Sequence, residues 1–118
     1  MHELSLARDI IDTVQQNVPK EEIGRIKFVV IKVGAFSGVV TDSLKFSFQA
    51  ITSDTELSGA ELEIIDIPFL LKCNTCGNTT TNEFGMMICS GCGSVDTEML
   101  SGNELQVVEV KIETMEEI

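Results

Sequence analysis

The sequence predicts an α+β fold: two helices on a three-stranded sheet, with an inserted four-cysteine module. Two observations predict it. Apolar residues recur at helical and then at strand spacing, twice over, along residues 1–67, and a third strand pattern follows residue 102. Between these stretches, residues 73–102 hold all four cysteines and five of the nine glycines, with few aliphatic side chains. For 118 residues we expect one core with a small appended module.

The first helix and the first strand are expected before residue 34. Pro19 should end the helix, because proline cannot continue the backbone hydrogen-bond ladder. Residues 25–33 are dense in β-branched side chains, which predicts a largely buried strand. The apolar stripe of the helix, at spacings of three and four residues, consists of Leu4, Ala7, Ile11, Val14 and Val18.

A second helix is expected after the turn bracketed by Gly34 and Gly38. Thr41 or Asp42 is expected to cap its first N–H groups, and the helix should end near Thr52. Its buried stripe should be Leu44, Phe48 and Ile51.

The second and third strands enclose the cysteine module. The second is predicted by Leu62, Ile64 and Ile67 and is closed by Pro68. The third follows Gly102, with its apolar residues at Leu105, Val107, Val110 and Ile112. The predicted domains are therefore an α/β domain of residues 1–67 and 103–118, and an inserted domain of residues 68–102.

Composition narrows the class of protein. The chain carries 19 acidic and 8 basic residues, a net charge of −11, so its surface should repel phosphate backbones and a nucleic-acid partner is not expected. No apolar run approaches the roughly 18 residues of a membrane span, and the amino terminus lacks a signal-peptide pattern. We expect a cytoplasmic protein without membrane contact, whose thiols stay reduced.

The cysteines form two Cys-x-x-Cys pairs, Cys73 with Cys76 and Cys89 with Cys92, separated by twelve residues. Two residues between cysteines let one tight turn aim both sulfur atoms at a single ion, and the spacing of the pairs is typical of four-cysteine zinc sites. Four protein ligands leave no open position for water, so the ion should stabilise rather than catalyse. A redox dithiol pair or two disulfides fit the compartment and spacing less well.

A glycine follows each pair, at Gly77 and Gly93. We expect these glycines to adopt a positive φ and to present their amides to a sulfur atom. Iron in a rubredoxin-like site uses similar turns. The sequence favours zinc without excluding iron.

The amino terminus holds the single histidine of the chain, His2. A lone histidine near a terminus is usually solvated. However, the α-amine of Met1, the amide nitrogen of His2 and its imidazole are able to close fused chelate rings around one ion. Planar nitrogen donors suit Ni(II) and Cu(II), and since the affinity order favours copper, a cell must select nickel through availability.

Several segments, in this order and spacing, carry a family resemblance across nearly the whole chain. They are Met1-His2-Glu3-Leu4-Ser5, Asp42-Ser43-Leu44 with Phe46 and Phe48, Gly59-Ala60 with Leu62-Glu63-Ile64, both cysteine pairs, and Gly102-Asn103-Glu104-Leu105. The chain resembles the HypA family of hydrogenase maturation proteins, which are nickel metallochaperones. A Met-His-Glu start combined with a late paired Cys-x-x-Cys module is far more specific than either alone.

The resemblance implies a non-enzymatic carrier of Ni(II) with a structural Zn(II). It implies delivery of nickel, with a hydrogenase maturation nickel GTPase, into the hydrogenase large subunit, and in some organisms to urease through its maturation proteins. It also implies a nickel-binding α/β domain with an inserted zinc domain. By the matching motifs, the nickel site would be Met1, His2 and Glu3, and the zinc site Cys73, Cys76, Cys89 and Cys92.

The chain departs from some relatives because it has no second histidine. A further nickel ligand must then be a backbone nitrogen, a carboxylate or water. Asp42 is a conceivable donor, although helix capping explains it better. A zinc-ribbon adaptor without a nickel site is the main alternative, and a nucleic-acid-binding ribbon is a weaker one. An enzyme has least support, since no serine–histidine pair, phosphate loop or open metal site is present.

Overall fold

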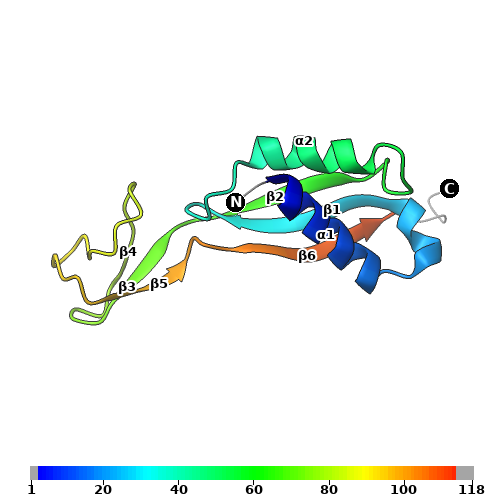
Figure 1. The fold of residues 1–118 in the computed structure, drawn as a ribbon. Coiled ribbons are helices and arrows are strands. Elements are labelled where there is room, and N and C mark those ends of the chain that lie inside the picture. Colours follow the sequence, from blue (N-terminus) through cyan, green and yellow to red (C-terminus); the bar gives the residue numbers. More distant parts are fainter. Residues whose placement is uncertain (1–2, 114–118) are drawn as a thin grey trace. The chain divides into compact units, whose positions relative to one another are not determined.

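The structure, a computed structural model, describes residues 3–113 (Figure 1). Its helices are α1 (Glu3–Asn17), the 3₁₀ helix η1 (Lys20–Arg25) and α2 (Thr41–Thr52). Its strands are β1 (Ile26–Gly34), β2 (Glu61–Ile67), β3 (Leu70–Cys73), β4 (Thr79–Thr80), β5 (Thr97–Ser101) and β6 (Leu105–Ile112). The strands form two sheets of order β2-β1-β6 and β4-β3-β5. The predicted α+β class is confirmed, with its two helices, its three-stranded sheet and its separate cysteine-bearing segment.

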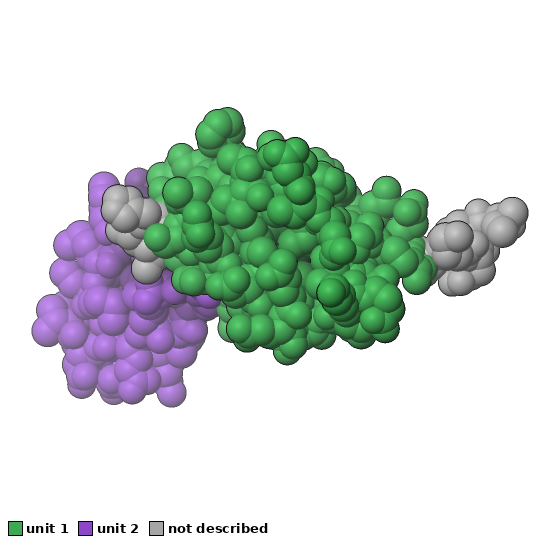
Figure 2. All heavy atoms as spheres, turned by 45° about the vertical axis from the view of Figure 1, so that its right-hand side comes forward, with its two compact units in different colours: residues 1–32, 39–65, 106–118 green, residues 33–38, 66–105 purple. Residues whose placement is uncertain are grey.

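The chain divides into two compact units (Figure 2). Unit 1 comprises Met1–Lys32, Val39–Ile65 and Gln106–Ile118, and unit 2 comprises Val33–Gly38 and Asp66–Leu105. Unit 2 takes in the end of β1 and the turn after it. That turn is tied to the cysteine-bearing segment because Ala35 N–H donates to the Ile67 carbonyl (2.9 Å) and Phe36 N–H to the Gly102 carbonyl (2.8 Å).

Helix α1 buries one face and ends before proline, as predicted. Ala7, Ile11 and Val14 are buried, but the prediction for Leu4 was wrong, since its side chain is 48% exposed. Leu6 and Ile10 occupy the core instead. The apolar residues of α1 cover a face wide enough to bury either Leu4 or Leu6, and their spacing alone does not show which of the two is buried. In the described residues no helix is both long and apolar enough to cross a membrane.

Strand β1 is the centre of the unit 1 sheet. Val29, Val30 and Ile31 are successive and all buried, so both faces of the strand are covered there. Strand β6 runs antiparallel to it, since Glu113 N–H donates to the Arg25 carbonyl and Gly34 N–H to the Glu104 carbonyl (2.8 Å each). Strand β2 returns after the crossover helix α2, which makes the sheet mixed (Figure 1).

Helix α2 begins without the predicted cap. Its N-cap residue is Val40, no side chain caps it, and Thr41 and Asp42 already belong to the first turn, so the capping prediction was wrong. The Val40 N–H donates instead to a carboxylate of α1, Glu3 Oε2, at 3.5 Å. Leu44 and Phe48 are buried as expected, Ile51 is half-buried and Thr52 is buried, with its hydroxyl bonded to the Phe48 carbonyl (2.8 Å).

The small sheet of unit 2 was not predicted. Strand β3 pairs antiparallel with β4 and with β5, and Leu71 at its centre is fully buried. Phe69, just before β3, is buried and meets the Phe36 ring edge to face, with centroids 5.1 Å apart. These strands are only two to five residues long, too short for an alternating pattern to stand out.

Two glycines allow a close backbone approach inside unit 2. A Cβ atom at Gly34 would lie 2.2 Å from the Gly102 carbonyl carbon, and a Cβ at Gly102 would lie 2.8 Å from Phe69 Cα. Gly102 also has φ +121°, which side chains rarely adopt. Neither position therefore has room for a side chain without moving the backbone.

The two phenylalanines of α2 predict a contrast in stability. Phe48→Ala should lower the free energy of unfolding by about 3–5 kcal/mol, because it leaves a cavity where a fully buried ring stood. Phe46→Ala, at a ring that is 74% exposed, should change it by less than about 0.5 kcal/mol. Urea unfolding followed by the helical circular dichroism signal measures both, and equal losses would contradict the assigned core.

Candidate metal centre

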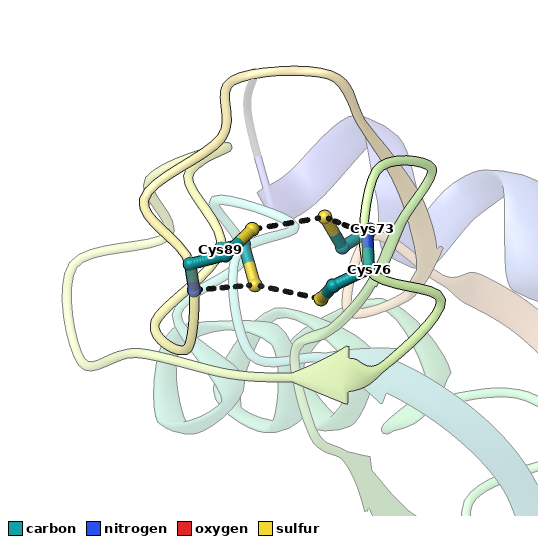
Figure 3. A group of neighbouring side chains, drawn as sticks. Cys73, Cys76 and Cys89 are labelled. Atoms are coloured by element: carbon teal, nitrogen blue, oxygen red, sulfur yellow. Dashed lines mark hydrogen bonds between the residues drawn. The ribbon is translucent and has the colours of Figure 1, made fainter.

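Two turns bring the four cysteines of the chain together. Their sulfur atoms all lie within 4.8 Å of one another, with 3.6 Å between the Cys73 and Cys92 sulfurs and 3.8 Å between those of Cys76 and Cys89. All four are free of disulfides. Figure 3 shows Cys73 and Cys76 on one turn facing Cys89 on the other. The first cysteine of each pair is buried and the second is exposed.

The two turns share one backbone hydrogen-bond pattern. In the first, Cys73 N–H donates to the Asn78 carbonyl and the Cys73 carbonyl accepts from Gly77 N–H, both at 2.9 Å. In the second, Cys89 N–H and carbonyl make the same two bonds, to Ser94 and Gly93, also at 2.9 Å. The positive φ expected of the glycines is confirmed, at +78° for Gly77 and +76° for Gly93.

The amides that point at sulfur are not those of these glycines, so that part of the prediction was wrong. Gly77 and Gly93 donate to the carbonyl of the first cysteine, because the left-handed residue closes the turn there. Cys73 Sγ accepts instead from Cys76 N–H (3.4 Å). Cys89 Sγ accepts from Gly91 N–H (3.4 Å) and Cys92 N–H (3.5 Å). Amides inside each turn thus stabilise negative charge on the first sulfur.

Polar side chains also link the two turns, and the sequence analysis missed them. Thr75 Oγ1 lies 2.8 Å from Ser94 Oγ, and Asn74 Nδ2 donates to Asp96 Oδ1 (3.2 Å). Asn74 N–H also donates to the Asp96 carbonyl (2.9 Å). The available signal was that small polar residues lie between the two cysteines of the first pair and just after the second pair.

The thiols differ in pKa because backbone amides and neighbouring sulfurs make different hydrogen bonds with each of them. The pKa of Cys73 is lowered to about 6, chiefly because Cys76 N–H donates to its sulfur, and the pKa of Cys89 is lowered chiefly by Cys92 N–H. Ser94 N–H lowers the pKa of Cys92, but hydrogen bonds with the other sulfurs, led by Cys73, and desolvation raise it to about 12. Four adjacent thiolates therefore need a cation among them.

The donor set fits a tetrahedral metal ion. With a Zn–S bond of about 2.3 Å, the sulfurs of a regular tetrahedron are about 3.8 Å apart. The sulfur pairs at 3.6 and 3.8 Å match this spacing. The remaining sulfur–sulfur distances are at most 4.8 Å, which is about 1 Å longer. Four thiolates suit zinc and also iron, so the sulfur geometry does not choose between them. Neither ion would have an open position for a substrate.

The amino-terminal candidate site is described only in part. Met1 and His2 lie outside the described residues. Glu3 is half-buried at the start of α1, where its carboxylate accepts the Val40 N–H. It lines an open hollow of about 450 Å³ together with Asp42 and Ser43 from the first turn of α2.

An α+β unit joined to a unit with a closed four-cysteine centre is typical of a protein that binds metal without catalysing a reaction on it. A family model described as "Hydrogenase/urease nickel incorporation, metallochaperone, hypA" matches residues 1–112. The chain therefore belongs to the HypA family. It is a nickel metallochaperone for hydrogenase maturation and not an enzyme.

Curated relatives agree along almost their whole length. A hydrogenase maturation factor HypA from Chlorobium phaeobacteroides is 36% identical over 113 residues, covering 96% of this chain and 100% of the relative. A factor of the same name from Dechloromonas aromatica is also 36% identical, over 115 residues, with coverages of 96% and 100%.

The fold is shared with solved structures. The solution structure of the Ni metallochaperone HypA from Helicobacter pylori superposes with a TM-score of 0.66 over 95% of this chain and 97% of that one, at 23% identity. A second solution structure of a HypA protein gives a TM-score of 0.68, also at 23% identity, over 95% and 96% of the two chains. At this identity the likeness concerns the fold.

The glycines of the second turn predict a contrast in metal affinity. Gly93→Ala forces a side chain into the left-handed region at a cost of about 1–2 kcal/mol, so zinc affinity should fall roughly five- to thirtyfold. Gly91→Ala is the control, because its Cβ would meet Cys89 Sγ at an ordinary 3.7 Å. Competition with a chromophoric chelator measures both variants. Equal affinities would show that the positive φ does not matter for binding.

Proposed function

We propose that this chain carries Ni(II) at its amino terminus, on Met1, His2 and Glu3, and holds Zn(II) at Cys73, Cys76, Cys89 and Cys92. The observation that carries the proposal is the family match, which begins at residue 1 and so includes both motifs. The nickel domain is residues 1–67 with 103–118, and the zinc domain is residues 68–102. The protein works in the cytoplasm, where the four thiols stay reduced.

The nickel site rests on the chemistry of the first three residues. The Met1 α-amine, the His2 amide nitrogen and the His2 imidazole supply three nitrogen donors in fused chelate rings, and a planar nitrogen set suits Ni(II). Glu3 adds a carboxylate. One of its oxygens accepts the Val40 N–H, which leaves the other oxygen for a cation. A site on a few terminal donors is open on its outer side, so the ion can be surrendered to an acceptor.

The zinc site is the fixed counterpart of this open one. Its four sulfurs come from two hydrogen-bonded turns, and together they fill all four coordination positions of the ion, so no position is free for another ligand. Zinc is favoured over iron because a chaperone of nickel gains nothing from a redox-active ion. The role of the ion is to fold the cysteine-bearing segment.

Delivery requires protein partners. We propose a hydrogenase maturation nickel GTPase, which takes part in the transfer, and the hydrogenase large subunit, which receives the ion. The family description also names urease, so urease maturation proteins are further candidates. A nucleic acid is not among the partners, because the net charge of −11 opposes binding to phosphate.

Two variants of the amino terminus test the nickel site. His2→Ala, or an extension by two residues before Met1, should abolish stoichiometric nickel binding, because each removes one donor of the chelate. Nickel titration by calorimetry and by the visible absorption of planar Ni(II) measures the loss, and elemental analysis should still find one zinc. As control, an extension that a protease removes to regenerate Met1 should bind nickel again. Undiminished binding in both variants would defeat the proposal and leave a zinc-binding adaptor.

Removal of zinc tests the structural role. After chelation, amides in residues 73–102 should lose protection from hydrogen exchange more than amides of α1 and α2, because metal binding and folding share one free energy in this segment. Re-addition of Zn(II) should restore protection. A uniform loss across both units would contradict a structural role confined to the cysteine-bearing segment.

A further inference from the structure

We propose that residues 82–88, the apolar loop of unit 2, form a docking surface for a protein partner whose matching face is apolar and rich in Lys and Arg. The inference deepens the proposed function and rests on it, because nickel delivery requires a partner to be held. The inference names the surface that holds the partner, and this surface does not include the residues proposed to bind nickel.

The apolar loop has a defined conformation. Asn82 Oδ1 accepts from Phe84 N–H (3.0 Å) and Met86 N–H (2.9 Å), and Asn82 Nδ2 donates to the Met86 carbonyl (2.8 Å). Thr97 Oγ1, on β5, donates to the Met87 carbonyl (3.0 Å). One asparagine thus holds both sides of the loop, and β5 holds its end.

Gly85 holds the tip of the loop against the Phe36 ring, which is itself 40% exposed. Its φ is +67°, and a Cβ there would lie 3.0 Å from the Phe36 ring, so the glycine backbone packs directly on that ring. The Phe36 ring in turn packs edge to face on Phe69, which is only 2% exposed. The loop therefore turns its glycine inward and its flanking side chains outward.

Those flanking side chains are large, apolar and exposed. Phe84 is 75% exposed and Met86 48%, and Met87 and Ile88 are also exposed. The hydrogen bonds that shape the loop use the side chains of Asn82 and Thr97 and backbone groups, so none of them needs an apolar side chain at 84 or 86. A ring that is three-quarters exposed, like that of Phe84, buries little apolar surface within unit 2, which points to an interaction surface. Methionine suits such a surface because its flexible thioether adapts to a partner.

Charge selects the kind of partner. Residues 73–110 contain five acidic residues and no Lys, Arg or His. Unit 2 as a whole has five acidic residues and one lysine, a net charge of −4, to which a zinc ion with four thiolates adds −2. A basic partner face complements this surface. A second copy of the chain or an anionic membrane would instead be repelled.

The test uses two phenylalanines with matched exposure. Phe84→Ala removes the ring from the apolar loop, and Phe46→Ala removes an equally exposed ring (74%) from unit 1. The probes are the purified nickel GTPase and the purified hydrogenase large subunit, each measured against the zinc-loaded chain without nickel. Phe84→Ala should weaken binding to at least one probe by about tenfold or more, and Phe46→Ala by less than about twofold. Association should slow at about 0.5 M NaCl.

Two further measurements complete the test. Met86→Gln keeps the side-chain length and should also weaken binding, which shows that apolar character matters. Nickel titration and zinc content of Phe84→Ala should equal those of the unchanged chain, since Phe84 is not a proposed ligand of either ion and its ring is 75% exposed.

The outcomes separate the two proposals. Binding that Phe84→Ala leaves intact would overturn the docking surface while delivery stands. An unchanged chain that binds nickel but neither probe would overturn the docking surface and the proposed delivery, leaving the nickel site. Phe84-dependent binding to phosphatidylserine vesicles, or Phe84-dependent dimerisation by sedimentation, would also overturn the proposal.

Discussion

Unit 2 depends on a metal ion because its four cysteine sulfur atoms lie within 4.8 Å of one another. Thiols so close cannot all ionise without a cation, and without ionisation they do not bind one. Amides within the two turns lower the pKa of Cys73 and Cys89, which favours loss of the first protons. A divalent ion then stabilises all four thiolates. The buried residues of unit 2 show why the ion matters. Apart from two cysteines they include only Val33, Phe69 and Leu71 among its large apolar side chains. So few side chains make a small core.

Unit 1 is built on the opposite principle. Two helices and a mixed sheet bury a continuous set of aliphatic side chains, with Leu44, Phe48 and Ile31 completely buried. A unit with such a core does not need metal to fold, which agrees with the proposed use of its amino terminus for an ion that comes and goes. The proposed pair of sites, a closed thiolate site for a resident ion and an open nitrogen site for the transported one, would use the different preferences of Zn(II) and Ni(II).

The elements that could be predicted were those in which one spacing of apolar residues, or of cysteines, is repeated. Repeated spacing predicts helices α1 and α2, strands β1, β2 and β6, and the paired cysteines. It does not predict details that depend on a single contact. Leu4 fits the helical stripe yet is exposed. Thr41 and Asp42 are good cap residues by type, but the N-cap position falls on Val40. The short strands β3–β5 depend on pairing between residues far apart in sequence, and no single segment reveals such pairing.

The position of the cysteine-bearing segment in the chain has one more consequence. It separates β2 from β6, so residues 68–104 must be spanned before β6 can join β1. Ser101 Oγ donates to the Pro68 carbonyl (2.6 Å), which holds the two ends of that span together once the segment is ordered. Shortening a flexible span of 37 residues to a few lowers the entropy cost of loop closure by about 2 kcal/mol. A shortage of the metal ion that orders this segment would then slow completion of the sheet and delay the maturation of the nickel carrier itself.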